Sequence, residues 1–410
     1  MSQTGRSVRQ LEIHPAFSSR IPFMQRPVYL DNAATTPMDP LVFEAMKPWF
    51  LERYGNSSSS SHLFGWEARD AVEEAREQVA TLIGARAREV CFTSGATESV
   101  NLAIKGVAEG FGFTATHVVT CATEHSAVLV ACRHLERLGC RVTRIGVDAE
   151  GCLDLDEVAD AVEADTRLFA FMHANNETGV LHPIEKLSSF AREKGILLLC
   201  DATQTVGKMP LSVDRLGVDL MAFSAHKFHG PKGTGGLYIR KREETNILVA
   251  QIDGGGHERG MRSGTLNVPG IVGMGMASEV SLRSIREEAL RIRALRDRLE
   301  TALLAMPGCR INGHPEKRLH SLSNLSFEGV DGPSFLKAVS GRLALSAGSA
   351  CRSLVQKPSH VLSAMGVPEA LALASFRFSL GRFSTTEDME VAIDLIGSRL
   401  GGADQCIRKK

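Results

Sequence analysis

The sequence predicts an α/β protein with a mostly parallel central sheet in a large domain and a second, smaller α+β domain. Between about residues 65 and 240, short apolar or β-branched runs alternate with segments of helical period, which is typical of βαβ units. A length of 410 residues also favours one large domain plus a smaller one over a single core. These observations indicate an open sheet covered by helices, with room for a buried site.

Seven runs have the length and composition of strands, and helices are expected in the gaps between them. The expected strands cover residues 89–93, 117–121, 141–147, 168–172, 196–200, 220–223 and 236–239. A turn at Gly95 follows the first run and leads into a segment with a helical apolar face. That turn therefore presents a helix N-terminus at the carboxyl end of a strand.

After Gly264 the pattern changes to that of a long helix with an apolar stripe. The stripe consists of Leu282, Ile285, Ala289, Ile292, Leu299 and Leu303. We interpret this helix as the connector between a large domain of residues 27–282 and a small domain of residues 283–410. Strands are expected in the small domain at 323–327 and 376–380, and residues 1–26 form an arm that can pack on it.

Composition argues against several classes of protein. Lysine plus arginine and aspartate plus glutamate both number 47, so no attraction to nucleic acid or anionic membranes is expected. Nine cysteines without a Cys-x-x-Cys pair argue against a disulfide framework and a structural zinc site. No apolar run approaches the roughly 20 residues of a membrane span, so we expect a soluble protein, and the cysteine usage favours a reducing, cytoplasmic compartment. Residues 1–26 are rich in arginine, as transit peptides are, but their poor apolar spacing favours a plain arm.

Lys227 is a candidate for Schiff-base chemistry. It closes the run Ser224-Ala225-His226-Lys227, which follows an apolar strand-like stretch, and Asp201 ends another such stretch upstream. Pyridoxal phosphate needs both an amine that forms an imine and a carboxylate that pairs with its pyridinium nitrogen. A surface lysine in a glycine-rich turn is the alternative, and the lysine alone does not decide between them.

The segment Thr93-Ser94-Gly95-Ala96-Thr97-Glu98 is a candidate phosphate site. Backbone N–H groups at a helix start, a glycine that allows close approach and flanking hydroxyls would bind a dianion. An ordinary capping box, with Ser94 followed by Thr97 and Glu98, is the alternative interpretation.

Further polar residues at predicted strand ends favour the cofactor interpretation, because open α/β sheets bind their ligands there. His125 offers a flat ring to stack on a pyridine, and Asn176 and Gln204 offer donors to its phenolic oxygen. Asp201 would keep the ring nitrogen protonated, which makes the ring an electron sink. Each of these residues taken singly is better explained as a cap or a turn residue, so the weight lies in their combination.

The chain resembles the cysteine desulfurases of the NifS/IscS type, in the class-V aminotransferase family of pyridoxal-phosphate-dependent enzymes. The motifs that carry the resemblance span nearly the whole length and cover residues 29–37, 93–98, 124–126, 174–179, 201–207, 224–236, 254–265, 346–351 and 377–382. Such enzymes convert L-cysteine to L-alanine and an enzyme-bound persulfide. The resemblance implies fold type I, with a seven-stranded sheet, and a homodimer.

The resemblance also implies roles for individual residues. Lys227 would form the internal aldimine and shuttle protons, Asp201 would pair with the pyridinium, and His125 would stack on the ring. The phosphate and the phenolic oxygen would be held by Ala96, Thr97, Asn176, Gln204, Ser224, Ala225, His226 and, from the partner subunit, Thr265. Substrate binding would fall to Arg377, whose planar fork suits a carboxylate, and to Asn32.

Cys351 distinguishes a sulfur-transfer enzyme from other enzymes that use pyridoxal phosphate. A thiolate can attack the substrate sulfur, and the small residues 346–353 suit a loop that carries a persulfide toward an acceptor. The alternative for a lone cysteine is a small core residue, which suits Cys91, Cys121 and Cys200 but not Cys351. No permanent metal is implied, although Cys351 is expected to ligate a nascent iron-sulfur cluster transiently on a scaffold partner.

The sequence around Cys351 is similar to that of desulfurases which serve iron-sulfur scaffold proteins. Iron-sulfur cluster assembly, and beyond it tRNA thiolation, is therefore the expected use of the sulfur. The alternatives are a desulfurase dedicated to DNA or cofactor modification, a selenocysteine lyase, another aminotransferase or lyase, and a non-catalytic docking platform. Departures at Ala347, at Ser57 to Ser61 and in the arginine-rich arm bear on the choice of partner more than on the chemistry.

Overall fold

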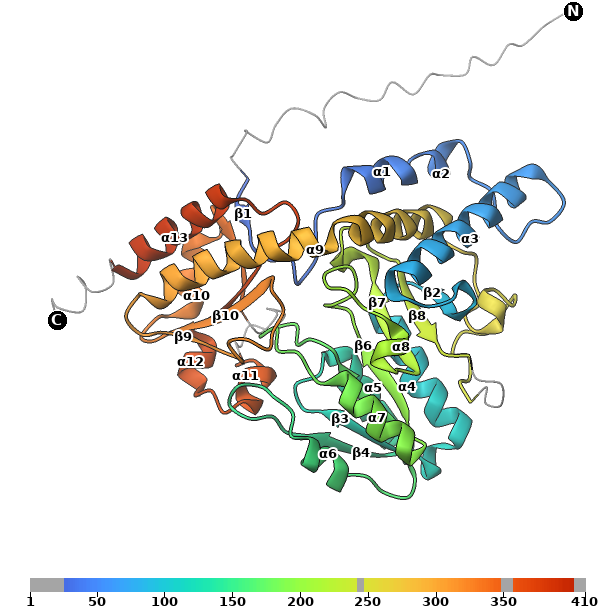
Figure 1. The fold of residues 1–410 in the computed structure, drawn as a ribbon, viewed down its shortest axis with the longest axis horizontal. Coiled ribbons are helices and arrows are strands. Elements are labelled where there is room, and N and C mark those ends of the chain that lie inside the picture. The colour runs from blue at the N-terminus through green and yellow to red at the C-terminus, as the bar shows by residue number, and fades with distance from the viewer. Residues whose placement is uncertain (1–25, 242–246, 348–356, 402–410) are drawn as a thin grey trace, which may run out of the picture.

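The computed structural model describes residues 26–241, 247–347 and 357–401, which form a large unit, a smaller unit and a long helix that joins them (Figure 1). That helix is α9 (Val268–Leu304), and it runs without a break across the predicted domain boundary at residues 282 and 283. The predicted division of the chain into domains stays a prediction.

The large unit is built on a seven-stranded sheet with the order β2-β8-β7-β6-β5-β3-β4. These strands are β2 (Val90–Thr93), β8 (Gly235–Ile239), β7 (Leu220–Ser224), β6 (Leu197–Asp201), β5 (Thr166–Met172), β3 (His117–Cys121) and β4 (Arg141–Ile145). All neighbours are parallel except β8, which runs antiparallel to both β2 and β7. The predicted mostly parallel sheet is therefore confirmed, with strand ends that differ from the expected ones by two residues at most.

Helices cover both faces of this sheet, as Figure 1 shows. They are α3 (Leu63–Ile83), α4 (Ala96–Phe111), α5 (Ser126–Arg137), α6 (Leu155–Asp160), α7 (Ile184–Lys194) and α8 (Val213–Leu216). Alternate residues of β5 point to opposite faces: Phe169 and Phe171 join one buried cluster with α3 and α7, and Leu168 and Ala170 join another with α4 and α5. Burial on both faces explains why inner strands such as β5 and β7 are nearly continuous apolar runs, whereas the edge strand β4 is largely exposed.

The smaller unit contains an antiparallel sheet with the order β12-β13-β10-β9. Its strands are β12 (Ser346–Ala347), β13 (Ser375–Ser379), β10 (Leu322–Phe327) and β9 (Cys309–Ile311), and its helices are α10 (Gly332–Val339), α11 (His360–Ala364), α12 (Glu369–Leu373) and α13 (Thr386–Gly401). The predicted strands at 323–327 and 376–380 are confirmed. The N-terminal strand β1 (Val28–Tyr29) pairs with β11 (Leu343–Ala344), so the chain starts against this unit before it enters the large one.

The remaining N-terminal helices are α1 (Pro40–Met46) and α2 (Pro48–Leu51), which lie along α9. The predicted stripe on α9 is buried at Ile285, Ile292, Leu299 and Leu303, but Leu282 is 44% exposed. The prediction for Leu282 was wrong because the buried side of the helix there passes through Ser281 and Ile285, four residues apart, and Leu282 lies about 100° round from Ser281. Among the described helices, none is both long and apolar enough to cross a membrane.

Candidate active site

A cavity of about 950 Å³ opens at the carboxyl ends of β3, β5, β6 and β7, where the smaller unit meets the large one. A volume of this size accommodates a cofactor together with a small substrate. The predicted site residues on its wall are Ala96, Thr97, His125, Asn176, Asp201, Gln204, Ser224, His226, Lys227 and Arg377. Residues from six separate sequence motifs therefore meet in one place.

Three predicted residues do not line this cavity. Ala225 is fully buried in the core, and the Asn32 side chain is also buried, where its Nδ2 donates to the Ser379 carbonyl at 2.9 Å. Thr265 is exposed and lies outside the cavity of its own chain. Their assigned roles stay predictions. Cys351 lies outside the described residues.

The start of α4 forms the predicted phosphate end of the cavity. Gly95 is the N-cap residue, has φ 153°, and makes no side-chain cap hydrogen bond. Of the expected capping box, one half is present: Glu98 Oε2 accepts from the backbone N–H of Ser94 at 2.8 Å. Because no side chain caps the helix in the described chain, the N–H groups of Ala96 and Thr97 remain available to an anion. A Cβ added at Gly95 would approach Ser224 Oγ to 3.6 Å, so the absence of a side chain keeps this corner open.

Lys227 lies in a short 3₁₀ turn that follows β7, and its Nζ donates to the carbonyl oxygens of Ala33 and Ala34, both at 2.7 Å. Burial, and to a smaller extent Arg377, lower the pKa of this amine, Asp201 and Asp31 oppose them, and the resulting pKa is about 8. An amine with such a pKa has a large neutral, nucleophilic fraction near pH 8. The neighbourhood thus prepares Lys227 to attack a carbonyl carbon.

Asp201 ends β6 on the cavity wall, where its Oδ1 accepts from the backbone N–H of Thr203 at 3.0 Å. Thr203 Oγ1 is buried there and has no hydrogen-bond partner among the described residues. A buried polar group without a partner is costly, so it indicates a ligand or water at this position.

His125 precedes α5, and its Nδ1 accepts from the backbone N–H of Ala127 at 3.1 Å. The neutral ring therefore carries its proton on Nε2. Burial lowers the pKa of His125, Asp201 opposes this, and the positive charges of Lys227 and His360 reinforce it. His125 is consequently a neutral imidazole at pH 7.

Arg377 comes from β13 of the smaller unit and faces the large one. Its Nη1 donates to the Asn176 carbonyl and its Nη2 to Asp31 Oδ1, each at 2.8 Å. Its Nε is buried and has no partner among the described residues. The guanidinium therefore keeps hydrogen-bonding capacity for an additional acceptor, such as a substrate carboxylate.

Sequence reasoning missed several residues of this site. Asp31 orients Arg377, and its position just after a strand could have identified it. Thr203 and Lys208 lie on either side of Gln204 in the sequence, and the four-residue spacing of Lys208 from Gln204 could have predicted their contact. Ser359 donates to the buried Glu177, and His360 Nε2 contacts the Glu124 carbonyl at 3.0 Å. No local pattern predicts those two contacts, because each joins residues far apart in sequence.

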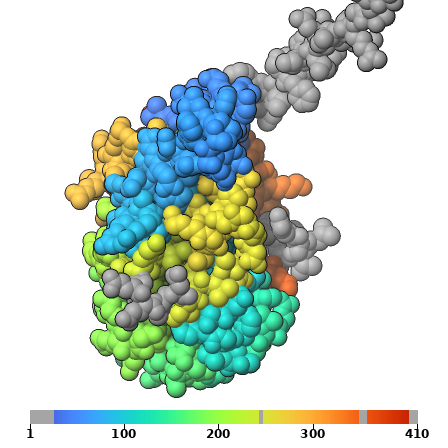
Figure 2. Space-filling view, turned by 90° about the vertical axis from the view of Figure 1, so that its right-hand side faces the viewer, coloured from blue at the N-terminus to red at the C-terminus, as the bar shows by residue number. Residues whose placement is uncertain are grey.

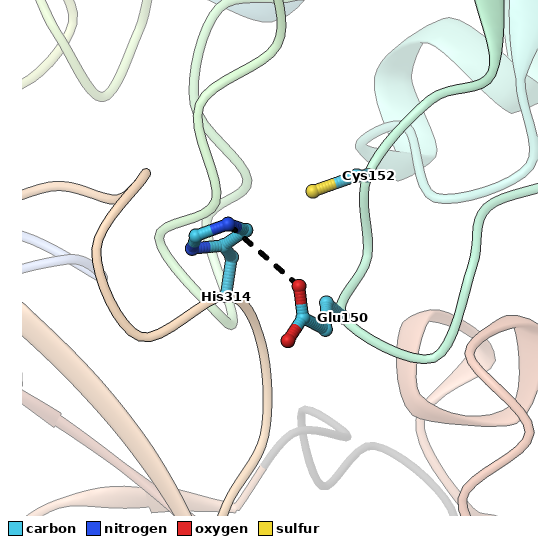
Figure 3. Close-up of side chains that lie close together, drawn as sticks. All are labelled: Glu150, Cys152 and His314. Atoms are coloured by element: carbon cyan, nitrogen blue, oxygen red, sulfur yellow. Dashed lines mark ion pairs between the residues drawn. The ribbon is translucent and has the colours of Figure 1, made fainter.

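One cluster outside the cavity has the residue types of a metal site. The ligand atoms of Glu150, Cys152 and His314 lie within 4.8 Å of one another, as Figure 3 shows. However, His314 Nδ1 accepts from the backbone N–H groups of Glu316 and Lys317, both at 3.0 Å. The proton of the neutral ring is then on Nε2, which faces Glu150 at 3.7 Å, and a protonated nitrogen cannot ligate a metal. We therefore interpret the cluster as a polar contact between the two units.

The comparisons with known proteins agree with this geometry. The family model described as aminotransferase class-V matches residues 28–391. The cysteine desulfurase IscS of Anaeromyxobacter dehalogenans (strain 2CP-C) is 52% identical over 378 residues, which is 92% of this chain and 93% of the relative. The chain belongs to the cysteine desulfurases of the class-V aminotransferase family.

Solved structures place this desulfurase among fold-type I enzymes. A NifS-like protein superposes with a TM-score of 0.85 at 38% identity, covering 92% of this chain and 99% of the other. The structure of SspA in complex with cysteine superposes with a TM-score of 0.77 at 36% identity, covering 87% and 99%. The predicted family, fold type and reaction are confirmed, and the desulfurase is a pyridoxal-phosphate-dependent enzyme that acts on L-cysteine.

The residues present fit pyridoxal phosphate. The uncapped N-terminus of α4 and the open corner at Gly95 suit a phosphate, and Lys227 supplies an amine of lowered pKa. Asp201 and the unpartnered Thr203 hydroxyl lie on the same wall, where a ring nitrogen needs an anion. Nothing in the cavity wall contradicts the cofactor that the family uses.

Proposed function

We propose that the cavity binds pyridoxal phosphate through Lys227, Asp201 and the start of α4, and that Cys351 takes up the sulfur of L-cysteine. Bound there, the cofactor supplies an aldehyde that forms imines with amines and a ring that accepts electrons. The observation that carries the proposal is the meeting of Lys227, whose pKa is lowered, with Asp201 and Arg377 in one cavity.

Substrate orientation falls to Arg377. Asp31 and the Asn176 carbonyl hold two of its nitrogens, which fixes the plane of the guanidinium, and the buried Nε has no partner in the described chain. A carboxylate that binds here lies at the mouth between the two units. The amino group of the same substrate can then face Lys227, since Arg377 and Lys227 line the same cavity.

Proton transfer falls to Lys227 and His125. Lys227 exchanges protons readily near neutral pH because its pKa is lowered to about 8. His125 presents Nε2 to the cavity, because Nδ1 is engaged by the backbone N–H of Ala127. Asn176 and Gln204 stand beside them as further lining groups, and Gln204 offers an amide donor to a phenolic oxygen.

Cys351 would act as a nucleophile toward the substrate sulfur. A new S–S bond forms between the two sulfur atoms while the C–S bond of the substrate breaks, and the electron pair of that bond passes to the carbon skeleton. Protonation of that carbon by Lys227 yields alanine. The net change is one thiol plus L-cysteine giving one persulfide plus L-alanine, so atoms and electrons balance without an external oxidant.

We also propose that the active protein is a homodimer. Large apolar side chains on α1, α2, the start of α3 and the segment between α2 and α3 are exposed, namely Leu41, Phe43, Phe50, Leu51, Tyr54, Leu63, Phe64 and Trp66. An apolar face of this kind marks a protein–protein interface. In Figure 2 the blue N-terminal segment with these helices lies on the same face as the yellow segment that includes residues after 246. A dimer through this face would bring Thr265 to the cavity of the partner.

Mixing two inactive variants tests this arrangement. Lys227→Ala lacks the amine, and Thr265→Ala is expected to bind the cofactor weakly at limiting concentration. If Thr265 acts across the dimer, a mixed dimer contains one site with both native residues, and mixing restores activity. Subunit exchange is first demonstrated separately. If activity is then not restored, the shared site is contradicted.

The acceptor of the persulfide is proposed to be an iron-sulfur scaffold protein, in the cytoplasm. The name IscS of the relatives and the similarity of the residues around Cys351 support this choice over DNA or cofactor modification. All cysteines in the described chain are free thiols, which suits a reducing compartment.

The experiment that tests the proposal combines two measurements. Borohydride reduction followed by peptide mapping should attach the cofactor to Lys227 and not to the exposed Lys186. Cys351→Ala should abolish persulfide formation and slow alanine formation, while the matched Cys152→Ala should leave both unchanged. Full alanine turnover by Cys351→Ala would defeat the desulfurase mechanism and favour another lyase.

A further inference from the structure

Lys208 is a second lysine beside the cofactor cavity; its side chain as a whole is half-buried, and its amine is enclosed by protein. It lies four residues after Gln204, and its Nζ donates to Gln204 Oε1 at 2.9 Å. Gln204 Nε2 in turn donates to the Ala33 carbonyl at 3.0 Å, which also accepts from Lys227 Nζ at 2.7 Å. A continuous chain of hydrogen bonds therefore joins the two lysines through Gln204 and Ala33.

Lys208 removes the ambiguity in the orientation of Gln204. A carboxamide can present either its oxygen or its nitrogen to a neighbour, but an ammonium group only donates. Gln204 Oε1 must therefore face Lys208, and Nε2 must face Ala33 and the cavity that Gln204 lines. Nε2 has two hydrogens, of which the Ala33 carbonyl takes one. The other is available to an acceptor such as a phenolic oxygen.

Lys208 has no carboxylate partner among the described residues. The charged groups that face it are cations, Lys227 and Arg377, and burial together with these charges lowers its pKa to about 7. The small cavity behind Lys227 is also lined by His229, His320, Glu288 and Arg382. Glu288 is the one acid on that wall, and Arg382 already pairs with it at 2.7 Å.

A buried cation without an anion is costly, so its retention calls for a reason. Asp201 and Asp31 raise the pKa of Lys227, while Arg377 lowers it. The positive field of Lys208 acts on the same region, because it also lowers the pKa of His226 and His320. An anionic phenolic oxygen near Gln204 would supply the negative charge that this region lacks.

We propose that Lys208 is a positioning residue for the cofactor: it holds the Gln204 carboxamide with its nitrogen toward the cavity, and in the holoenzyme its charge favours the anionic form of the phenolic oxygen. The inference rests on the proposed roles of Lys227 and Gln204. It adds a charge that acts through another side chain and does not touch the substrate.

The test measures the spectrum and the cofactor affinity of the holoenzyme. Lys208→Met keeps the aliphatic stem but removes the charge, so the pH midpoint of the cofactor's visible absorption change should rise by about one unit. Lys208→Arg keeps a charged donor, and its midpoint should stay within about 0.3 unit of the native value. The exposed Lys186→Met is the matched control and should not shift it.

A double-mutant cycle tests whether Lys208 acts through Gln204. Lys208→Met should weaken cofactor binding about tenfold in the native background, but less than about threefold when Gln204 is already leucine. Equal effects in both backgrounds would overturn the positioning role. An unchanged midpoint in Lys208→Met would overturn the electrostatic role.

A measurement on the unaltered apoprotein keeps the inference testable if Lys208→Met does not fold. Competitive labelling of amines across a pH range, read by mass spectrometry, should give Lys208 and Lys227 midpoints well below the ordinary lysine value of about 10.4. An ordinary midpoint for Lys208 would contradict the proposal. If instead borohydride attaches the cofactor to a lysine other than Lys227, the proposed function fails first, which distinguishes the two failures.

Discussion

Two arginine–carboxylate pairs, one remote from the cavity and one at its mouth, differ in what they leave unpaired. Arg76 and Glu258 form a closed pair: two nitrogens of Arg76 meet the two carboxylate oxygens at 2.7 and 2.8 Å, and Glu258 also accepts from the Phe92 N–H. Arg76 uses its remaining capacity on Glu73 and the Val90 carbonyl. In contrast, Arg377 at the cavity donates to only one oxygen of Asp31 and leaves its buried Nε unpaired in the described chain.

The difference separates a structural ion pair from a binding group. The closed pair fixes the turn at Glu258 and Arg259, whose φ values of 49° and 58° lie in the left-handed region that non-glycine residues avoid. The open pair keeps hydrogen-bonding capacity that only a ligand or water can use. The unfilled capacity of Arg377 on the cavity wall, more than its charge, therefore marks it as a binding group.

The largest effect is expected from breaking the closed pair. Arg76→Met would leave Glu258 buried without its partner, so the free energy of unfolding should fall by about 3–5 kcal/mol. Denaturant titration measures this loss. Arg283→Met, which removes an exposed pair with Glu279, should cost at most about 0.5 kcal/mol. A loss at Arg76 no larger than at Arg283 would remove the contrast between the two pairs.

Altering the open pair should affect catalysis more than stability. Arg377→Lys keeps a positive charge but loses the planar fork, so kcat/KM for L-cysteine should fall about 100-fold, which corresponds to about 2.7 kcal/mol. Initial rates of alanine formation give this value. Its unfolding midpoint should remain close to that of the native protein. A variant with native kcat/KM would show that the substrate carboxylate binds elsewhere.

Lys208 extends the comparison, because it is a charge on the cavity side without a counter-ion. Its pKa is lowered to about 7 in the folded chain, while an unfolded lysine titrates near 10.4. The folded apoprotein therefore bears the full cost of the buried charge below pH 7, and its stability should rise between about pH 7 and 10. Lys208→Met apoprotein should be more stable than the native apoprotein at pH 6 by about 2 kcal/mol, and this advantage should vanish near pH 10. Equal stability at pH 6 would indicate that the amine is hydrated.

The smallest effect concerns His125. Its surroundings lower its pKa below the ordinary histidine value, so the ring is more than half neutral at pH 6.5 and becomes largely protonated only at lower pH. Protonation adds a positive charge beside Lys227 and the cofactor, so the limb of the kcat profile that belongs to His125 should lie below pH 6.5. His125→Gln should remove that limb from the profile. A limb that persists in the variant belongs to another group, such as the Cys351 thiol.

Sequence reasoning predicted the parts of the site that follow from local pattern. The strand ends at Asp201 and Lys227 and the turn at Gly95 were found because apolar runs end there and polar residues follow. Leu282 shows the limit of that reasoning, since the spacing of a long helix does not say which unit covers which turn. The inner strands of the sheet needed no tertiary information, because burial on both faces makes them continuous apolar runs, whereas the edge strand β4 is largely exposed.

The contacts that orient the site could not be predicted from the sequence. Asp31 meets Arg377 and Glu258 meets Arg76 only after folding, because these partners are 346 and 182 residues apart in the chain. The unpaired Nε of Arg377 and hydroxyl of Thr203 are likewise properties of the folded environment. Such features depend on which groups burial leaves without water, and no periodicity encodes that.

The most direct test of the central claim is the mass of the peptide that contains Cys351 after the holoenzyme has reacted with L-cysteine. The account predicts a peptide heavier by one sulfur atom, in an amount that matches the first equivalent of alanine, and reversal of the change by a thiol reductant. Alanine formed in full while the Cys351 peptide keeps its original mass would contradict the account.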